Sequence, residues 1–526
     1  MPSDWRELFP LGAAGLARTI AAGHVSAREA VLALVGRIEA TSPRQNAVVF
    51  PRFEEARAEA EAADERQARR RPLPPLHGVP ITLKESLFLE GTPSTGGLPS
   101  RRGHRAMADG PLVARLRRAG AIVLGKTNVP QLLFDIESEN PVYGRTLNPW
   151  DPDRSPGGSS GGEAANLAVG GAALGIGTDL GGSIRLPAHA CGIHGLMPTS
   201  RRLTLDGTFD ALLAPGQEVL VPQPGPLGRR VEDLALALSV LVSGEDDTLD
   251  ADVAMASLPR PADESVLAGL RVGFCLDDGW FPPSPACQRA VREAAAALEE
   301  RGARVEAFVP PDAPLAMALF FGLMSAAGSG WARRLLAGDP VDPRLREMLL
   351  ASALPHPVNR ALARVLDVAG QPRRGRVVRA LGRRSTAEYW RLVAERKRYR
   401  DRFLAPDGPG RFDVWLAPPA PTPALRHGAS RFLLGAASYT MLYKVLGVPA
   451  GVVAATRVRS GEDGGRAKSR DPVERTAREV DTGSVGLPVG VHVAAPPWRE
   501  DLVLTVMAAL ETHFRAQPEY PDCPPL

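Results

Sequence analysis

The chain has 526 residues, 44% of them hydrophobic and 23% charged, which excludes an intrinsically disordered protein and allows a large buried core. Its formal net charge of +4 is too small to indicate nucleic-acid binding. The four cysteines lack C-x-x-C spacing, so we expect buried, reduced thiols in a cytoplasmic protein, with no metal site and no cofactor. They are Cys191, Cys275, Cys287 and Cys523.

Helix-like and strand-like segments alternate along the first quarter of the chain. The patterns predict helices at 11–40, 53–71 and 111–119, and strands at 78–84 and 121–124. The strand at 78–84 ends in Lys84. Such alternation is typical of helices layered on a central sheet.

The remainder continues the alternation and adds a helical insertion. We expect helices at 231–243 and 286–301, an Arg-rich helical region at 355–400, an exposed loop at 459–478, and strands at 271–274, 448–455 and 485–495. The late strands could complete the sheet begun near residue 80. The sequence therefore predicts an α/β fold, a mixed central sheet with helices on both faces. It is one domain, 1–526, with a helical cap inserted at about 335–405.

Two segments bear on membrane targeting. Met1–Leu16 contains Asp4, Arg6 and Glu7, so we expect no signal peptide there. Residues 313–331 carry no charge and are long enough to span a bilayer. Their glycines and serines dilute the hydrophobicity, which favours a buried core helix.

Two short motif matches lack the structural context that their chemistry requires. Residues 120–127 fit the phosphate-loop pattern GxxxxGK[ST], but the expected strand lies inside the motif instead of before it. Residues 157–161 fit the G-x-S-x-G nucleophile elbow, yet the proline-rich segment 148–156 cannot be the strand that leads into an elbow. We reject nucleotide binding and an α/β-hydrolase site.

A glycine-rich stretch at 155–187 holds the candidate nucleophiles Ser159, Ser160 and Ser183. The apolar run 164–176 distinguishes it from a flexible linker, so its glycines indicate close backbone approach. The residues 180–183, Leu-Gly-Gly-Ser, could aim successive N–H groups at a developing oxyanion, although a tight glycine turn with an incidental serine explains them equally well.

The candidate base is Lys84, because no histidine lies in a triad pattern. A free lysine has a pKa of about 10.4, and lowering it by about three units costs roughly 4 kcal/mol, which burial could supply. The alternative is a surface lysine paired with Glu85.

The stretch 157–196 resembles the amidase signature family, through GGSSGGE at 157–163, GIGTDLGGSIRLPA at 175–188 and CGIHGL at 191–196. Supporting matches are GVPITLK at 78–84, GKTNVP at 125–130 and GLPVG at 486–490. Glu85 and Met197 depart from the usual family residues without removing a catalytic group. The resemblance implies the amidase signature fold and hydrolysis of carboxamide bonds.

The resemblance also implies residue roles. Ser183 would be the acylated nucleophile, Ser159 a proton relay on a cis peptide bond, and Lys84 the base. Ser160 would hydrogen-bond Lys84. The backbone N–H groups of Leu180, Gly181, Gly182 and Ser183 would form the oxyanion hole, and Asp179 and Arg185 would brace the loop.

Several stretches resemble fatty acid amide hydrolases within this family, among them TNVPQ at 127–131 and VPAGVV at 448–453. The resemblance implies lipophilic or fatty acyl amide substrates and places Leu133 in the acyl pocket, unless Leu133 is an ordinary core residue. The alternatives left open are the glutaminase subunit of a tRNA-dependent amidotransferase, a short-chain or aryl amidase, and a catalytically silent binding protein.

The segment 355–384 combines apolar residues at helical spacing with eight arginines and one acid, Asp367. A basic amphipathic helix is typical of membrane-surface binding, and a solvated cap helix is the competing interpretation. We expect a small-molecule amide substrate and no nucleic-acid partner. Peripheral membrane contact through 355–384 and a homodimer stay open.

Overall fold

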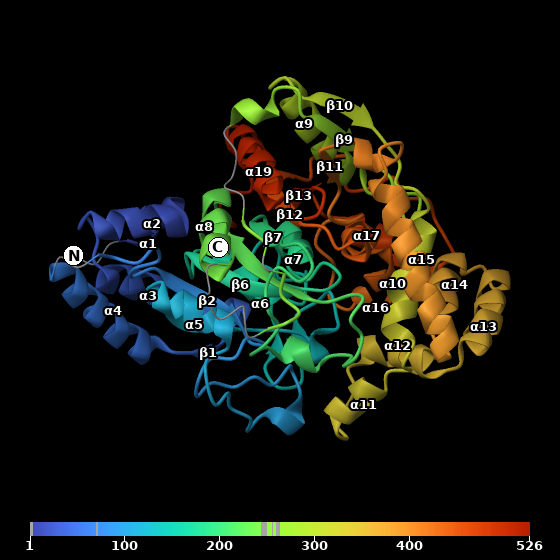
Figure 1. Cartoon of the computed structure of the whole chain (residues 1–526), viewed down its shortest axis with the longest axis horizontal. Coiled ribbons are helices and arrows are strands. Elements are labelled where there is room, and N and C mark those ends of the chain that lie inside the picture. Colours follow the sequence, from blue (N-terminus) through green and yellow to red (C-terminus); the bar gives the residue numbers. More distant parts are fainter. Residues whose placement is uncertain (1–3, 70–71, 243–249, 255, 259–263, 526) are drawn as a thin grey trace.

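The computed structural model describes residues 4–69, 72–242, 250–254, 256–258 and 264–525. The ends of two expected helices, at 70–71 and 243, lie outside these residues. Within them, eleven strands form one sheet that runs through the middle of the molecule (Figure 1). In spatial order they are β1 Val48–Pro51, β3 Ile122–Thr127, β2 Pro80–Lys84, β6 Leu174–Asp179, β8 Gln223–Gly228, β7 His194–Met197, β12 Ala450–Arg457, β13 Pro488–Ala494, β11 Val414–Ala417, β9 Arg271–Phe274 and β10 Arg304–Ala307.

The sheet is mixed, as the sequence predicts. Strand β2 pairs in parallel with β3 and β6, and β9 pairs in parallel with β10 and β11, whereas the strands between these groups are antiparallel. A small separate hairpin joins β4 Glu139–Asn140 to β5 Gly144–Arg145. Because β2 is flanked on both edges, every residue from Pro80 to Lys84 is buried.

Helices cover both faces of the sheet. They are α1 Trp5–Leu8, α2 Gly12–Ala21, α3 Ala27–Gln45, α4 Phe53–Ala68, α5 Pro111–Arg118, α6 Gly161–Ala168, α7 Arg185–Cys191, α8 Val231–Val242, α9 Pro285–Glu299, α16 Ser430–Leu433, α17 Ser438–Leu446, α18 Pro472–Asp481 and α19 Glu500–Arg515. Successive strand residues point to opposite faces. In β12, Val453 packs with α8 and α19, while Val452 packs with α6 and α7.

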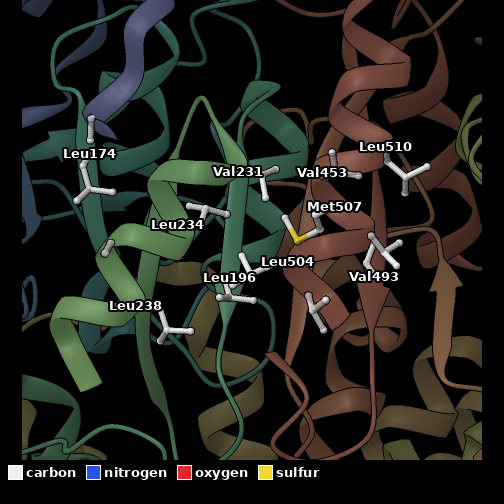
Figure 2. Close-up of a cluster of buried hydrophobic side chains, with 14 of the residues drawn as sticks. Leu174, Leu196, Val231, Leu234, Leu238, Val453, Val493, Leu504, Met507 and Leu510 are labelled. Carbon is white, nitrogen blue, oxygen red and sulfur yellow. The ribbon is translucent and has the colours of Figure 1, made fainter. Parts of the chain in front are cut away.

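The largest apolar cluster lies where α8 and α19 meet the central strands (Figure 2). Leu234 and Leu238 of α8 face Leu196 of β7, and Met507 of α19 fills the space beside them. A side chain on Gly451 would strike the Met507 sulfur at 2.3 Å, so glycine permits this close approach. This core fixes the sheet that carries the candidate site.

Most predicted elements are confirmed, with three differences. The helix expected at 11–40 is two helices, α2 and α3, because Gly23 adopts a φ of 76° and Ser26 starts α3 with a capping box. The loop expected at 459–478 ends in α18, which begins at Pro472 after an Asp471 cap. Cys523 is exposed, unlike the other three cysteines, and all four are free thiols.

The remaining helices gather at one end of the molecule, opposite α1–α4 (Figure 1). They are α10 Ala313–Ser325, α11 Gly330–Leu336, α12 Pro343–Ala353, α13 His356–Val368, α14 Pro372–Ala380 and α15 Thr386–Leu404. The uncharged stretch at 313–331 is broken after Ser325, and α10 is mostly buried. Among the described residues, only the bent pair of α10 and α11 has the length and composition to cross a membrane; no single helix does.

Candidate active site

Lys84 is a fully buried lysine at the end of the central strand β2. Its Nζ donates to Ser159 Oγ at 2.8 Å, to Thr178 Oγ1 at 2.6 Å and to the Thr178 carbonyl at 3.3 Å. Thr178 comes from β6, the parallel neighbour of β2, so the sheet itself brings these groups together. The alternative surface pairing with Glu85 is wrong, because Glu85 is buried and accepts N–H groups from Thr95 and Gly96.

Burial lowers the pKa of Lys84 to about 8, although the nearby carboxylates Asp210, Asp179 and Glu163 act in the opposite direction. The uncharged amine is therefore more accessible near neutral pH than in a free lysine. An uncharged amine has a lone pair that can accept the proton of a hydroxyl. The environment of Lys84 thus meets the first requirement for a general base.

The two adjacent serines are held differently. The Gly158–Ser159 peptide bond is cis, which confirms the conformation that the family resemblance implies. Ser160 comes just before α6, its N–H donates to the Ser183 carbonyl at 3.0 Å, and so the two serine segments lie side by side. The expected bond from Ser160 to Lys84 is wrong: among the described residues, the Ser160 hydroxyl donates to the Thr178 carbonyl at 3.4 Å.

Ser183 lies in a loop organised by the Asp179 carboxylate. Oδ1 accepts the Gly182 N–H at 2.8 Å and Oδ2 accepts the Ile184 N–H at 3.0 Å. Arg185 adds two further bonds of 2.9 Å, from Nε and Nη2, and both members of the pair have no exposed surface. Burial opposes the charge on Asp179, but Arg185 outweighs it and holds the pKa of Asp179 well below its ordinary value.

The Gly182 N–H therefore donates to Asp179, whereas the four-donor oxyanion hole expected from the sequence includes it. Within the described residues, the N–H groups of Leu180, Gly181 and Ser183 have no protein acceptor. Gly182 has a φ of 128°, and a side chain there would meet Thr440 Oγ1 at 2.5 Å. Glycine is thus required at 182 for the turn and not for oxyanion binding.

An apolar pocket of about 700 Å³, partly continuous with solvent, opens beside Ser183. Leu133 lines it, as expected, on a turn where Leu132 and Leu133 both have positive φ. The helices α10 and α11 supply much of the remaining wall, including Phe320, Phe321 and Trp331. The sequence signal for this wall was the uncharged stretch at 313–331, which we assigned only to the core.

Sequence reasoning also missed Thr178 and the role of Glu163. Glu163 is fully buried and accepts the hydroxyls of Thr82 and Thr127, the latter at 2.7 Å. Burial raises its pKa to about 7, although those hydroxyl bonds oppose the shift. Thr178 lies directly before Asp179 in the glycine-rich stretch, and only the pairing of β2 with β6 shows that it contacts Lys84.

A family model described as amidase matches residues 29–504. The chain belongs to the amidase family. It is therefore an amide hydrolase, and within the signature motifs at 157–196 Ser159 accepts from Lys84 while the Ser160 N–H donates to the Ser183 carbonyl.

Comparisons with individual proteins support the same family. Fatty acid amide hydrolase 1 of Caenorhabditis elegans is 34% identical over 495 residues, which cover 93% of this chain and 86% of that protein. Fatty-acid amide hydrolase 1 of Sus scrofa is 37% identical over 444 residues, covering 83% and 75%. A solved fatty acid amide hydrolase structure superposes with a TM-score of 0.81 at 26% identity, covering 97% of this chain and 86% of that one.

We predict that Asp179→Ala lowers the free energy of unfolding by about 3–5 kcal/mol, because it leaves the buried Arg185 charge uncompensated. Urea unfolding followed by circular dichroism measures the change. The matched control is Asp401→Ala, which removes the exposed partner of Lys397 in α15 and should cost less than about 1 kcal/mol. Equal losses in the two variants would contradict the assignment.

Proposed function

We propose that this amidase forms an acyl-enzyme on Ser183, with Ser159 as proton relay and Lys84 as the base. The observation that carries the proposal is the 2.8 Å contact between the buried Lys84 amine and Ser159 Oγ, beside the pocket that Ser183 lines. No other buried amine among the described residues donates to a serine of the glycine-rich stretch.

We infer the proton path from the Lys84–Ser159 bond and from the Ser160 N–H bond to the Ser183 carbonyl, which holds the two serine segments side by side. Uncharged Lys84 accepts the Ser159 proton while Ser159 accepts the proton of Ser183, whose oxygen attacks the amide carbon. The carbonyl oxygen becomes an oxyanion that the N–H groups of Leu180, Gly181 and Ser183 can stabilise. The proton then returns through Ser159 to the leaving nitrogen, and water releases the acid by the same route.

The substrates we propose are lipophilic amides, with fatty acyl amides foremost. The pocket wall consists mainly of aromatic, leucine and methionine side chains, and the first relatives are named for fatty acid amides. A glutaminase would need charged partners for the amino and carboxylate groups of glutamine. Among the described lining residues the only charged one is Asp135, so no cation faces such a carboxylate.

We predict that Ser183→Ala lowers the kcat of wild type by at least about a thousandfold on every amide, because no nucleophile remains. The measurement is a hydrolysis panel of long-chain acyl amides, short aliphatic amides, aryl amides and glutamine, together with labelling by a fluorophosphonate probe. Wild type should prefer the long-chain members.

The control is Ser239→Ala on the exposed surface of α8, which should hydrolyse and label as wild type does. Retained turnover in Ser183→Ala would refute the nucleophile. A wild-type preference for glutamine or for short amides would refute the substrate class alone.

We predict that kcat/KM on an amide rises as pH passes through about 8 and then levels, because the base works only when Lys84 is uncharged. Lys84→Met should remove this rise and lower the amide rate by about 10²–10⁴-fold. Hydrolysis of an activated ester should suffer less than in Ser183→Ala, since its leaving group needs no proton.

Lys126→Met provides the matched control. Lys126 is also fully buried, its pKa is likewise lowered to about 8 by burial, and its Nζ donates to the Pro93 carbonyl away from the serines. Persistence of the pH dependence in Lys126→Met assigns it to Lys84. A wild-type profile without a rise near pH 8 would contradict the proposal.

We further propose that residues 335–405 form a cap whose outer face touches membranes. Four large apolar residues of α13 are exposed, namely Val358, Leu362, Val365 and Val368, of which Val368 is 92% exposed. The α13 arginines 360 and 364 are exposed and have no acidic partner among the described residues. Apolar side chains flanked by free cations suit an anionic lipid surface. The expected homodimer stays a prediction.

We predict that Val365→Asp/Val368→Asp weakens binding to vesicles containing anionic lipid by about tenfold or more, because two exposed apolar side chains that would enter the lipid are replaced by carboxylates. Vesicle sedimentation measures the partition. Val309→Asp is the control, since Val309 is 69% exposed and lies outside the cap. A wild-type protein that stays in the supernatant would overturn the membrane proposal while leaving the catalytic one intact.

A further inference from the structure

Arg344, near the start of α12, lies at the centre of an acidic cluster. Its Nε lies 3.2 Å from Asp135 Oδ2, and its Nη1 lies 3.6 Å from Glu137 Oε2 and 3.3 Å from Glu139 Oε2. Nη2 lies 2.6 Å from Asp342 and donates to the Glu139 carbonyl at 3.2 Å. The Arg344 side chain is only 9% exposed.

This cluster contains more carboxylates than cations, so the neighbouring side chains could not supply the positive charge that Arg344 provides. Burial, and then the neighbouring Glu137 charge, raise the pKa of Asp135. Two other basic groups face these acids among the described residues: Arg145, whose Nε lies 2.9 Å from Glu139 Oε2, and His427, whose Nδ1 lies 3.9 Å from Glu137 Oε2. Removing Arg344 would leave buried like charges with little compensation.

The acids that Arg344 holds lie against the cis peptide at Gly158–Ser159. A side chain on Gly158 would come within 2.7 Å of the Glu137 nitrogen and 2.8 Å of the Asp135 carbonyl oxygen. Ser138 continues this contact, because its hydroxyl donates to the Gly157 carbonyl at 3.0 Å. The 135–138 backbone therefore packs directly against the two residues that precede Ser159.

The helix that carries Arg344 also lines the pocket. Met348, Leu349 and Ser352 lie one to two turns along α12 and face the same cavity as Ser183. The start of α12 is fixed further by Gln131, which donates to the Pro340 carbonyl at 2.9 Å and accepts the Asp342 N–H at 2.8 Å. The Arg344 guanidinium thus links α12, which forms part of the pocket wall, to the 135–138 segment that packs against Gly158.

We propose that Arg344 is a positioning residue that couples the acyl pocket to the Ser159 segment, so that chain-length preference depends on it. The inference rests on the proposed function, because it takes the pocket as the acyl site. A long acyl chain contacts α12, so its placement at Ser183 depends on the position of that helix. A short amide reaches Ser183 without contacting α12 and depends less on the wall.

The test compares kcat and KM of wild type, Arg344→Gln and Arg344→Lys on a C18 primary amide and on propionamide. For Arg344→Gln we expect kcat/KM to fall by about tenfold or more on the C18 amide and by less than about threefold on propionamide. Arg344→Lys should recover part of the C18 rate, because an ammonium keeps the charge but reaches fewer carboxylates at once.

Arg346→Gln is the matched control, since Arg346 is exposed two residues further along α12 and donates to the Val341 carbonyl at 3.1 Å. It should leave both rates unchanged. Asp135→Asn provides a second variant if Arg344→Gln does not fold: it breaks the same junction while lowering the excess of negative charge, and should shift the C18-to-propionamide ratio in the same direction. Equal loss on both substrates, or none, would overturn the coupling. A wild type that does not favour the C18 amide would instead refute the proposed substrate class.

Discussion

The site depends on one constraint: an amine is kept out of water in the middle of a sheet. Lys84 ends a strand that is paired on both edges, and within the described residues its Nζ donates to the hydroxyls and carbonyl that β6 and the glycine-rich stretch present. Desolvation is the largest influence on its pKa. In the proposed mechanism, burial in the sheet is thus what lets Lys84 act as a base near neutral pH.

The Asp179–Arg185 pair supports this arrangement in two ways. It fixes the Ser183 loop through backbone bonds to Gly182 and Ile184, and it places a countercharge beside the only nearby acid of that loop. An unpaired Asp179 would favour the charged form of Lys84, because opposite charges attract strongly where water is excluded. Neutralisation by Arg185 therefore helps to keep the amine available.

The sequence predicted the elements better than the contacts between them. Periodicity located β2, β9, α4 and α8 closely, because each obeys a local pattern of burial. Periodicity predicted α2 and α3 as one helix, because the turn at Gly23 and the N-cap at Ser26 are weak signals inside an apolar repeat. The motif positions of Lys84, Ser159 and Ser183 were available from the sequence. The Thr178 contact and the committed Gly182 N–H were not, since both arise from strand pairing and side-chain packing.

The uncharged stretch at 313–331 shows why composition alone left the pocket unassigned. The stretch is long enough to span a bilayer, and its burial is typical of a core helix. Its side chains also line the pocket, where Phe320 and Phe321 of α10 and Trp331 of α11 form part of the wall. A helix with an apolar surface all round can pack on the sheet with one side and leave the other for a ligand. The two helices meet at a bend of 52°, and side chains from both line the pocket. In the proposed mechanism, the apolar cavity beside Ser183 selects the substrate, and the buried amine of Lys84 helps to cleave it.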